Sequence, residues 1–236
     1  MEKKIIAIGG GEIKSKTTLK IDEYIVNLAK HHAGDKRATG LFIGTASHDS
    51  MPYFNSYRKT YTSVFDIKAE VALTVYGEMN YDHIKEKFLK ADMIYIGGGD
   101  TKFMLDSWAQ SGLKDLIFDA YERGVIIAGL SAGAICWFNK MYTDFDLMRN
   151  QQNGEYKILD GLGVLDGMCS PHFNEREVDF KQNILKYKDK FDFAYGIEND
   201  CALEFTDGKL TKVISAGGKA YKLTLSGEDL IKEELK

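Results

Sequence analysis

Residues 124–138 read Gly-Val-Ile-Ile-Ala-Gly-Leu-Ser-Ala-Gly-Ala-Ile-Cys-Trp-Phe, and this stretch decides the fold. The mostly β-branched run at 125–128 predicts a buried strand, and the apolar residues after Gly133 are compatible with a helix. Ser131 therefore lies in the Gly-x-Ser-x-Gly pattern of a nucleophile elbow, for which Gly129 and Gly133 supply the small side chains. The alternative interpretation is a buried strand-to-helix turn whose glycines only allow close packing.

Strands and helices are predicted to alternate on the N-terminal side of this stretch. Short apolar strands are expected at 4–8, 41–44, 67–73 and 93–96, and helices at 21–31, 53–62, 82–89, 101–108 and 113–123. This cadence is the signature of βαβ units, so the strand at 125–129 should be central in a parallel sheet. Ligands bind beyond the carboxyl ends of the strands in such sheets, and Ser131 lies at one of these ends.

The chain changes character after the elbow. Residues 142–165 are more polar and irregular, and a helix is expected at 178–187. Strands are then expected at 193–197, 202–206, 210–214 and 220–225, with Asp207-Gly208 as a hairpin turn. We expect a single α/β domain over 1–236 with a β-rich C-terminal segment, because the chain has no repeat or linker and is of ordinary domain size.

Composition argues against several classes of protein. The chain has 236 residues and a net charge of −4, and its basic residues are interspersed with acids, which argues against a nucleic-acid partner. Its apolar runs are too short for a bilayer and its N-terminus enters a strand directly, so we expect a cytoplasmic protein without a membrane partner. The three cysteines are widely spaced and match neither a disulfide framework nor a metal motif: Cys136, Cys169 and Cys201.

A serine hydroxyl attacks a carbonyl at neutral pH only with the help of a base, usually a histidine that an acid orients. His172 is the candidate base, because it follows a proline between a predicted strand and a predicted helix. Glu198 is favoured as the acid and Asp200 is the alternative, since both lie where one C-terminal strand ends and the next begins. The interpretations without catalysis are an ordinary loop histidine and an ordinary hairpin turn.

Backbone amides for an oxyanion are available beside the predicted nucleophile. The amide of Ala132 follows Ser131, and Gly98 or Gly99 can bring a second amide close to a substrate because glycine has no side chain. A phosphate-binding turn is the alternative for this second segment. The cluster at 9–11, Gly-Gly-Gly, fits neither a dinucleotide fingerprint nor a Walker A loop, and a tight turn is expected there.

Four segments together resemble one family. They are Ile-Gly-Gly-Gly-Asp-Thr (96–101), Gly-Leu-Ser-Ala-Gly-Ala (129–134), Pro-His-Phe (171–173) and Gly-Ile-Glu-Asn (196–199). In this order and spacing they resemble the peptidase E group of serine peptidases, which includes cyanophycinases. The resemblance implies a fold similar to class I glutamine amidotransferases, a three-layer sandwich with a central, mostly parallel sheet.

The same resemblance assigns roles to individual residues. Ser131 is implied as the nucleophile, His172 as the base, and Gly99 and Ala132 as the oxyanion donors. Many relatives carry a glutamate where this chain has Asn199, and others have an acid at the position of Glu198.

Substrate choice follows the resemblance less closely. Relatives that cleave after an N-terminal aspartate have a longer loop after the histidine, which contributes a basic residue for the substrate carboxylate. Here the chain passes quickly into a helix, where Arg176 is the candidate for that role and a surface arginine is the alternative interpretation.

The function expected from the resemblance is a serine exopeptidase or dipeptidase that cleaves small peptides, with N-terminal aspartate as the candidate residue, through an acyl-enzyme. No metal or organic cofactor is expected. The alternatives are a cyanophycinase-like hydrolase of β-aspartyl peptides, a homologue that binds a small molecule without catalysis, and a thiol hydrolase that uses Cys136. A homodimer is compatible with the sequence, which leaves the oligomeric state and the preferred side chains open.

Overall fold

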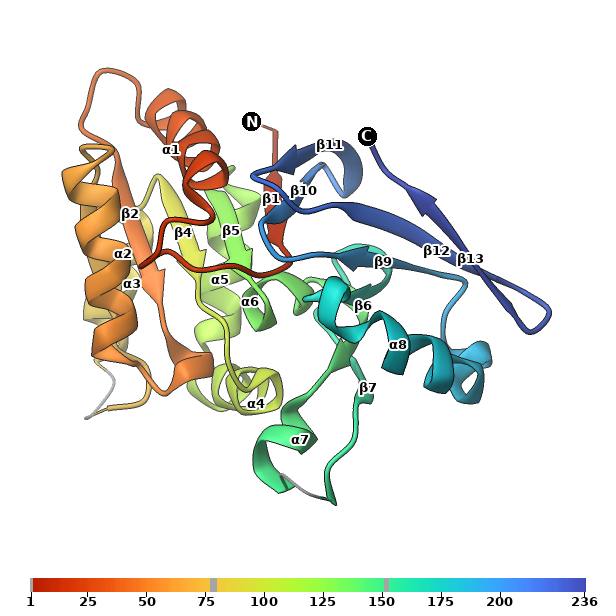
Figure 1. Cartoon of the computed structure of the whole chain (residues 1–236). Helices are drawn as coiled ribbons and strands as arrows, with labels where there is room; N and C mark the ends of the chain where they lie inside the picture. The colour runs from red at the N-terminus through yellow and green to blue at the C-terminus, as the bar shows by residue number, and fades with distance from the viewer. Residues whose placement is uncertain (1, 77–79, 151–152) are drawn as a thin grey trace.

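A computed structural model describes residues 2–76, 80–150 and 153–236 (Figure 1). Its first sheet has the strand order β11-β10-β1-β5-β4-β2-β3. Five neighbouring strands of this sheet run parallel: β1 (Lys4–Ile8), β5 (Ile126–Leu130), β4 (Met93–Ile96), β2 (Thr39–Ile43) and β3 (Lys68–Ala72). Two antiparallel strands complete it, β10 (Cys201–Thr206) and β11 (Lys209–Ser215), and the predicted hairpin turn joins them.

A second sheet of the order β13-β12-β9-β8-β6-β7 lies beside the first (Figure 1). Its strands are β6 (Phe138–Thr143), β7 (Lys157–Asp160), β8 (Leu165–Ser170), β9 (Phe193–Ile197), β12 (Ala220–Ser226) and β13 (Asp229–Glu234). The three central strands β6, β8 and β9 run parallel, and the outer pairs are antiparallel. One buried cluster contains Ile5 of the first sheet and Met141 of the second, so both sheets share a core.

Helices cover both faces of the first sheet, which explains why its central strands β5 and β4 are apolar at every position. Along β1, Ile6 and Ile8 pack with α1 (Leu19–Ala33) and α2 (Met51–Ser63). Ile5 and Ala7 face the opposite side, where three helices pack: α3 (Tyr81–Lys90), α4 (Thr101–Ser111) and α5 (Leu113–Glu122). Further helical segments are α6 (Ala132–Ile135), α7 (Phe145–Asn150), α8 (Phe173–Asn183) and two 3₁₀ helices (Thr45–Ser47 and Ile184–Lys190).

The structure confirms the parallel sheet and its central strand before Ser131, and it differs from expectation after the elbow. The helix expected there is only four residues long, and β6 begins at Phe138. Strands β6, β7 and β13 were not predicted, because polar residues interrupt their apolar pattern; Asn139 of β6 is exposed while Phe138 is buried. The strand end expected before His172 is the end of β8. The expected likeness to class I glutamine amidotransferases stays a prediction.

The carboxyl end of β1 connects the segments that carry the candidate residues. The backbone carbonyl of Ile8 accepts from the amide of Ser131 (3.0 Å), and that of Gly9 accepts from the amide of His172 (2.9 Å). The carbonyl of Gly10 accepts from the amide of Asp200 (3.1 Å). Three consecutive carbonyls therefore fix three segments that are distant in the sequence.

Within the described part of the chain, no helix has the length and apolar character that crossing a bilayer requires.

Candidate active site

Ser131 lies at a sharp turn between β5 and α6. Its φ of 52° and ψ of −110° are values that residues other than glycine rarely adopt, as a nucleophile elbow requires. A Cβ atom on Gly129 would lie 2.0 Å from the carbonyl oxygen of Gly133, and one on Gly133 would lie 2.2 Å from that of Ile96. Only glycine fits at either position, so the tight turn exposes the hydroxyl of Ser131 at the sheet edge.

His172 lies opposite this serine, between β8 and α8. Its Nε2 atom is 2.9 Å from Oγ of Ser131, which is within reach for a general base. The backbone of His172 is also left-handed, with a φ of 49°. The predicted serine and histidine are therefore brought together.

Asn199 occupies the position behind the histidine, where its Oδ1 atom lies 2.6 Å from Nδ1 of His172. The Nδ2 group of Asn199 donates to Oε1 of Glu175 (2.5 Å). Because a carboxylate only accepts, this contact turns the amide oxygen of Asn199 toward His172. The hydrogen of the neutral imidazole then lies on Nδ1, and Nε2 is free to accept from Ser131.

The expectation that Glu198 orients the histidine is corrected by these contacts. The carboxylate of Glu198 accepts from the backbone amide of Lys219 (2.9 Å) and from the hydroxyl of Tyr221 (3.1 Å), on the side of β12. Successive residues of an extended chain point in opposite directions, so Glu198 faces away when Asn199 faces His172. The alternative, Asp200, has a buried Oδ1 atom without a hydrogen-bond partner among the described residues.

Burial lowers the pKa of His172 from its ordinary value of 6.5, and the positive charge of Arg176 lowers it further. The contact with Asn199 and the charge of Glu175 act in the opposite direction. The net result favours the neutral imidazole, which is the form that accepts a proton from serine.

Arg176 does not have the substrate-binding position expected from the sequence, nor is it a surface residue. Its side chain is buried, with 4% of the residue exposed. Its Nη2 group donates to Asp144 (2.7 Å), and its guanidinium lies over the ring of Tyr156 at 5.2 Å. These contacts commit the charge of Arg176 to the protein interior.

The predicted oxyanion donors lie beside Ser131. A Cβ atom on Gly98 would be 3.2 Å from that of Ser131, and the Gly98 amide donates to the hydroxyl of Tyr53 (3.4 Å). Gly99 has a φ of 137°, and a Cβ atom there would lie 2.2 Å from the carbonyl oxygen of Ala46. Among the described residues, no acceptor contacts the amides of Gly99 and Ala132, so both remain available for a ligand.

A cavity of about 460 Å³ opens in front of the serine. Ser131, His172, Gly98, Gly99 and Leu130 form its base. The loop between β1 and α1 and one face of α2 form its walls: Gly11, Glu12, Ile13, Lys14, Pro52, Tyr53 and Ser56.

Sequence reasoning missed the function of the glycines after β1. A Cβ atom on Gly10 would lie 1.9 Å from Oδ1 of Asn199 and 2.4 Å from Nδ1 of His172. One on Gly9 would lie 2.4 Å from the carbonyl oxygen of Glu198. The glycines at 9 and 10 thus make room for the contact between His172 and Asn199, beyond forming a turn.

Cys136 is fully buried at the end of α6, where its Sγ lies 3.4 Å from the carbonyl oxygen of Gly133. Burial raises the pKa of its thiol well above the ordinary value of 9.0. A thiol in this position is a poor nucleophile, which argues against the thiol-hydrolase alternative.

Comparisons with sequence families, with relatives and with solved structures all match this chain to peptidases. The sequence model of peptidase family S51 matches residues 5–213. The uncharacterized peptidase YgaJ of Bacillus subtilis is 30% identical over 235 residues, which cover 97% of this chain and 95% of YgaJ. Peptidase E of Salmonella arizonae is 33% identical over 88 residues, 37% of each chain. The crystal structure of a peptidase from an acI-B1 actinobacterium has a similar fold, with a TM-score of 0.74 at 20% identity over 100% of this chain and 94% of that one.

Proposed function

The chain belongs to peptidase family S51, and from this premise we propose that it is a serine exopeptidase that hydrolyses short peptides through an acyl-enzyme. The observation that carries the proposal is the pair of contacts made by His172, 2.9 Å to Ser131 and 2.6 Å to Asn199. Such a chain of contacts is the arrangement that activates a serine hydroxyl.

The acylation step begins when the hydroxyl of Ser131 gives its proton to Nε2 of His172 as Oγ attacks the scissile carbonyl carbon. The amides of Gly99 and Ala132 donate to the resulting oxyanion. When the C–N bond breaks, the imidazolium of His172 protonates the leaving amine. Deacylation repeats the sequence with water, which gives its proton to His172 and attacks the ester, and Ser131 recovers its proton.

Asn199 and Glu175 divide the work that a single acid performs in other triads. Asn199 accepts from Nδ1–H of His172 and holds the ring, and it has no charge of its own. Glu175 supplies the negative charge from the other side of the Asn199 amide, at a contact of 2.5 Å. The imidazolium therefore gains an indirect electrostatic stabilisation.

The proposal that the substrate begins with aspartate is inferred from the family resemblance. The guanidinium of Arg176 is bound to Asp144 at 2.7 Å. Lys14 lines the cavity instead, and its ammonium group is the candidate to bind a substrate carboxylate. A second candidate function is the hydrolysis of β-aspartyl-arginine peptides, which the presence of Glu12 in the same cavity favours because its carboxylate suits a guanidinium.

Digestion of a peptide library, read by mass spectrometry, tests this function. Ser131→Ala is the control, and its turnover should be lower by about 10⁴-fold or more if the triad acts as a unit. Equal cleavage by both proteins would refute the assignment of Ser131. A direct comparison of Asp-X dipeptides with β-Asp-Arg then separates the two substrate classes.

A further inference from the structure

The cavity at Ser131 continues into a second depression of about 360 Å³, which shares Lys14 and Ser56 with it. One wall of this second depression is the loop before α1, which contributes Lys14 and Lys16. The other wall is α2, which contributes Asn55, Ser56, Lys59, Thr60, Ser63 and Val64. We call the second depression the α2 groove.

One stripe of α2 lines both depressions. Tyr53, Ser56, Lys59, Thr60 and Ser63 recur at intervals of three or four residues, so they share a helix face. From Tyr53 to Ser63 this face is about 15 Å long at 1.5 Å per residue. An extended peptide covers that length with roughly four to five residues. The two depressions together are therefore longer than a dipeptide needs.

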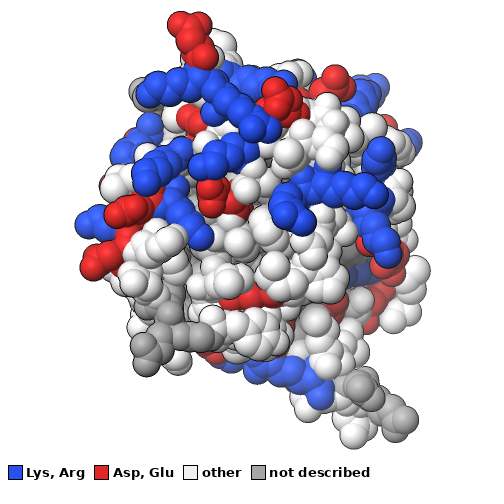
Figure 2. Space-filling view, turned by 90° about the vertical axis from the view of Figure 1, so that its left-hand side faces the viewer, with Lys and Arg blue, Asp and Glu red and all other residues white. Residues whose placement is uncertain are grey.

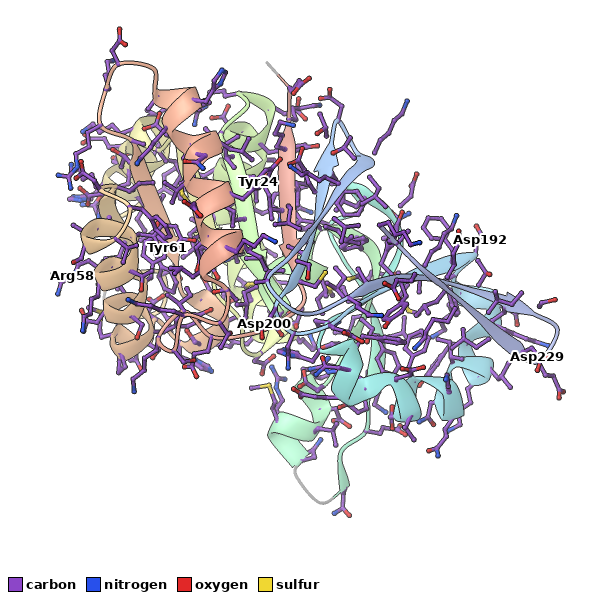
Figure 3. The ribbon with its side chains drawn as sticks, turned by 45° about the horizontal axis from the view of Figure 1, so that its top comes forward. Tyr24, Arg58, Tyr61, Asp192, Asp200 and Asp229 are labelled. Atoms are coloured by element: carbon purple, nitrogen blue, oxygen red, sulfur yellow. The ribbon has the colours of Figure 1, made fainter. Side chains whose placement is uncertain are left out.

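The α2 groove is basic, although the whole chain has a net charge of −4. Lys14, Lys16 and Lys59 line it, and no aspartate or glutamate does. Figure 2 shows lysine and arginine side chains gathered over the upper part of the face that carries α2, and Figure 3 shows Arg58 pointing outward from this helix.

The lysines of the groove also lack partners, as far as the described residues show: none of the three takes part in an ion pair. A neighbouring depression on the same face is partly neutralised. Its Arg37 is paired with Asp66 at 2.9 Å and its Lys68 with Glu70 at 2.8 Å, whereas its Arg58 and Lys59, the latter shared with the α2 groove, take part in no ion pair with a described residue. Positive charge is thus uncompensated in the groove that continues from Ser131.

We propose that the α2 groove binds the distal part of a peptide substrate longer than a dipeptide, and that this part is acidic. The inference rests on the proposed peptidase function and adds a second binding region to it. Ammonium groups donate and never accept, so Lys14, Lys16 and Lys59 select carboxylates along the bound chain. The hydroxyl of Ser63 supplies a hydrogen bond for its backbone, and that of Ser56, which donates to the carbonyl of Pro52, can accept one.

Matched pentapeptides test the inference. They share the residues at the scissile bond and carry either three glutamates or three glutamines at distal positions, in one set before that bond and in another after it. We expect kcat/KM to favour the glutamate peptide of one set by about 10- to 100-fold at low salt, since three exposed ion pairs each contribute a few-fold. Added salt should reduce this preference.

Lys16→Gln/Lys59→Gln is the decisive variant, because both lysines lie in the α2 groove and outside the cavity at Ser131. It should reduce the preference by roughly 5- to 20-fold and cleave the glutamine peptides like the parent protein. Lys85→Gln/Lys114→Gln, on α3 and α5, changes the net charge equally and should keep the preference. Equal cleavage of glutamate and glutamine peptides in both sets, or equal behaviour of the two double variants, would overturn the inference.

A binding measurement tests the α2 groove independently of the proposed peptidase activity. Fluorescent forms of the same pentapeptides are titrated into the Ser131→Ala protein, which needs no turnover. Tighter binding of the glutamate form, lost in Lys16→Gln/Lys59→Gln, supports the groove even where no peptide is cleaved. Cleavage without any difference in binding supports the peptidase and refutes the groove.

Discussion

Oδ1 of Asn199 lies 2.6 Å from Nδ1 of His172, so an uncharged amide stands where a Ser-His-acid triad has its carboxylate. The nearest negative charge is one contact further away, on Glu175. In the proposed mechanism these two residues share the role of the single acid of such a triad.

Variants that place the negative charge at position 199 instead of 175 test this arrangement. Asn199→Asp brings a second carboxylate into contact with Glu175, and the repulsion between them should lower kcat/KM by about 10- to 100-fold at neutral pH. In Asn199→Asp/Glu175→Gln the glutamine amide donates to the new aspartate, and activity should recover to the parent level or above. Steady-state kinetics of the two single variants and the double variant give the coupling free energy between positions 175 and 199. Additive losses would contradict the contact between these residues.

The pH profile of kcat/KM should have its acidic limb below 6.5, the ordinary pKa of histidine. Burial and Arg176 lower the pKa of His172, so the neutral base persists to lower pH than a free imidazole would. Rates measured from about pH 4.5 to 8 with a substrate that does not titrate check this limb. A midpoint at or above 6.5 would show that the charge of Glu175 outweighs burial.

Gly10→Ala should abolish most activity without unfolding the chain. The added methyl group would lie 1.9 Å from Oδ1 of Asn199, and even a displacement of about 1 Å at a catalytic group costs on the order of 100-fold in rate. Activity and thermal unfolding are measured together. Gly227→Ala is the matched control: its φ of 65° makes alanine strained, but no atom lies within 4 Å, so stability should fall slightly and activity should not.

Asp22 should make the free energy of unfolding depend on pH. Its carboxylate is buried and accepts from Thr18 (2.8 Å) and Tyr61 (2.7 Å), where α2 faces α1 (Figure 3). Burial raises its pKa from 3.8 to about 6, so the folded state binds the proton more tightly than the unfolded state. The stabilisation by this group is complete below pH 3.8 and is lost as the pH rises through 6.

Asp22→Asn tests this dependence by chemical denaturation at several pH values. The parent protein should lose about 2 kcal/mol between pH 4 and 7.5 relative to Asp22→Asn, since one pKa unit corresponds to about 1.4 kcal/mol and part of the effect is already lost at pH 4. Parallel pH profiles of the two proteins would contradict the burial of a carboxylic acid at this position.

The sequence predicted the parts of the site that local patterns encode. Ser131 stands between a strand and a helix in a pattern of small residues, and the proline before His172 marks a strand end, so both residues could be found without coordinates. The central parallel strands of the first sheet could be predicted for a similar reason, because burial on both faces makes β5 and β4 apolar throughout.

The sequence did not predict which way a side chain points or which distant residue it contacts. Glu198 and Asn199 are neighbours, and only the register of the chain after β9 decides which of them faces His172. An amide also carries no charge to suggest a triad member. Arg176 was expected to contact substrate, since nothing in its own segment reveals Asp144, its partner directly after β6.

The three carbonyls at the end of β1 have a consequence for protein synthesis. The residues that carry these carbonyls are synthesised first, and the segments that bind them are synthesised later, the last of them at Asp200. Ser131 and His172 can take their observed positions only on a chain whose segments are held by these carbonyls. The proposed active site can therefore form only after the chain has been translated as far as Asp200.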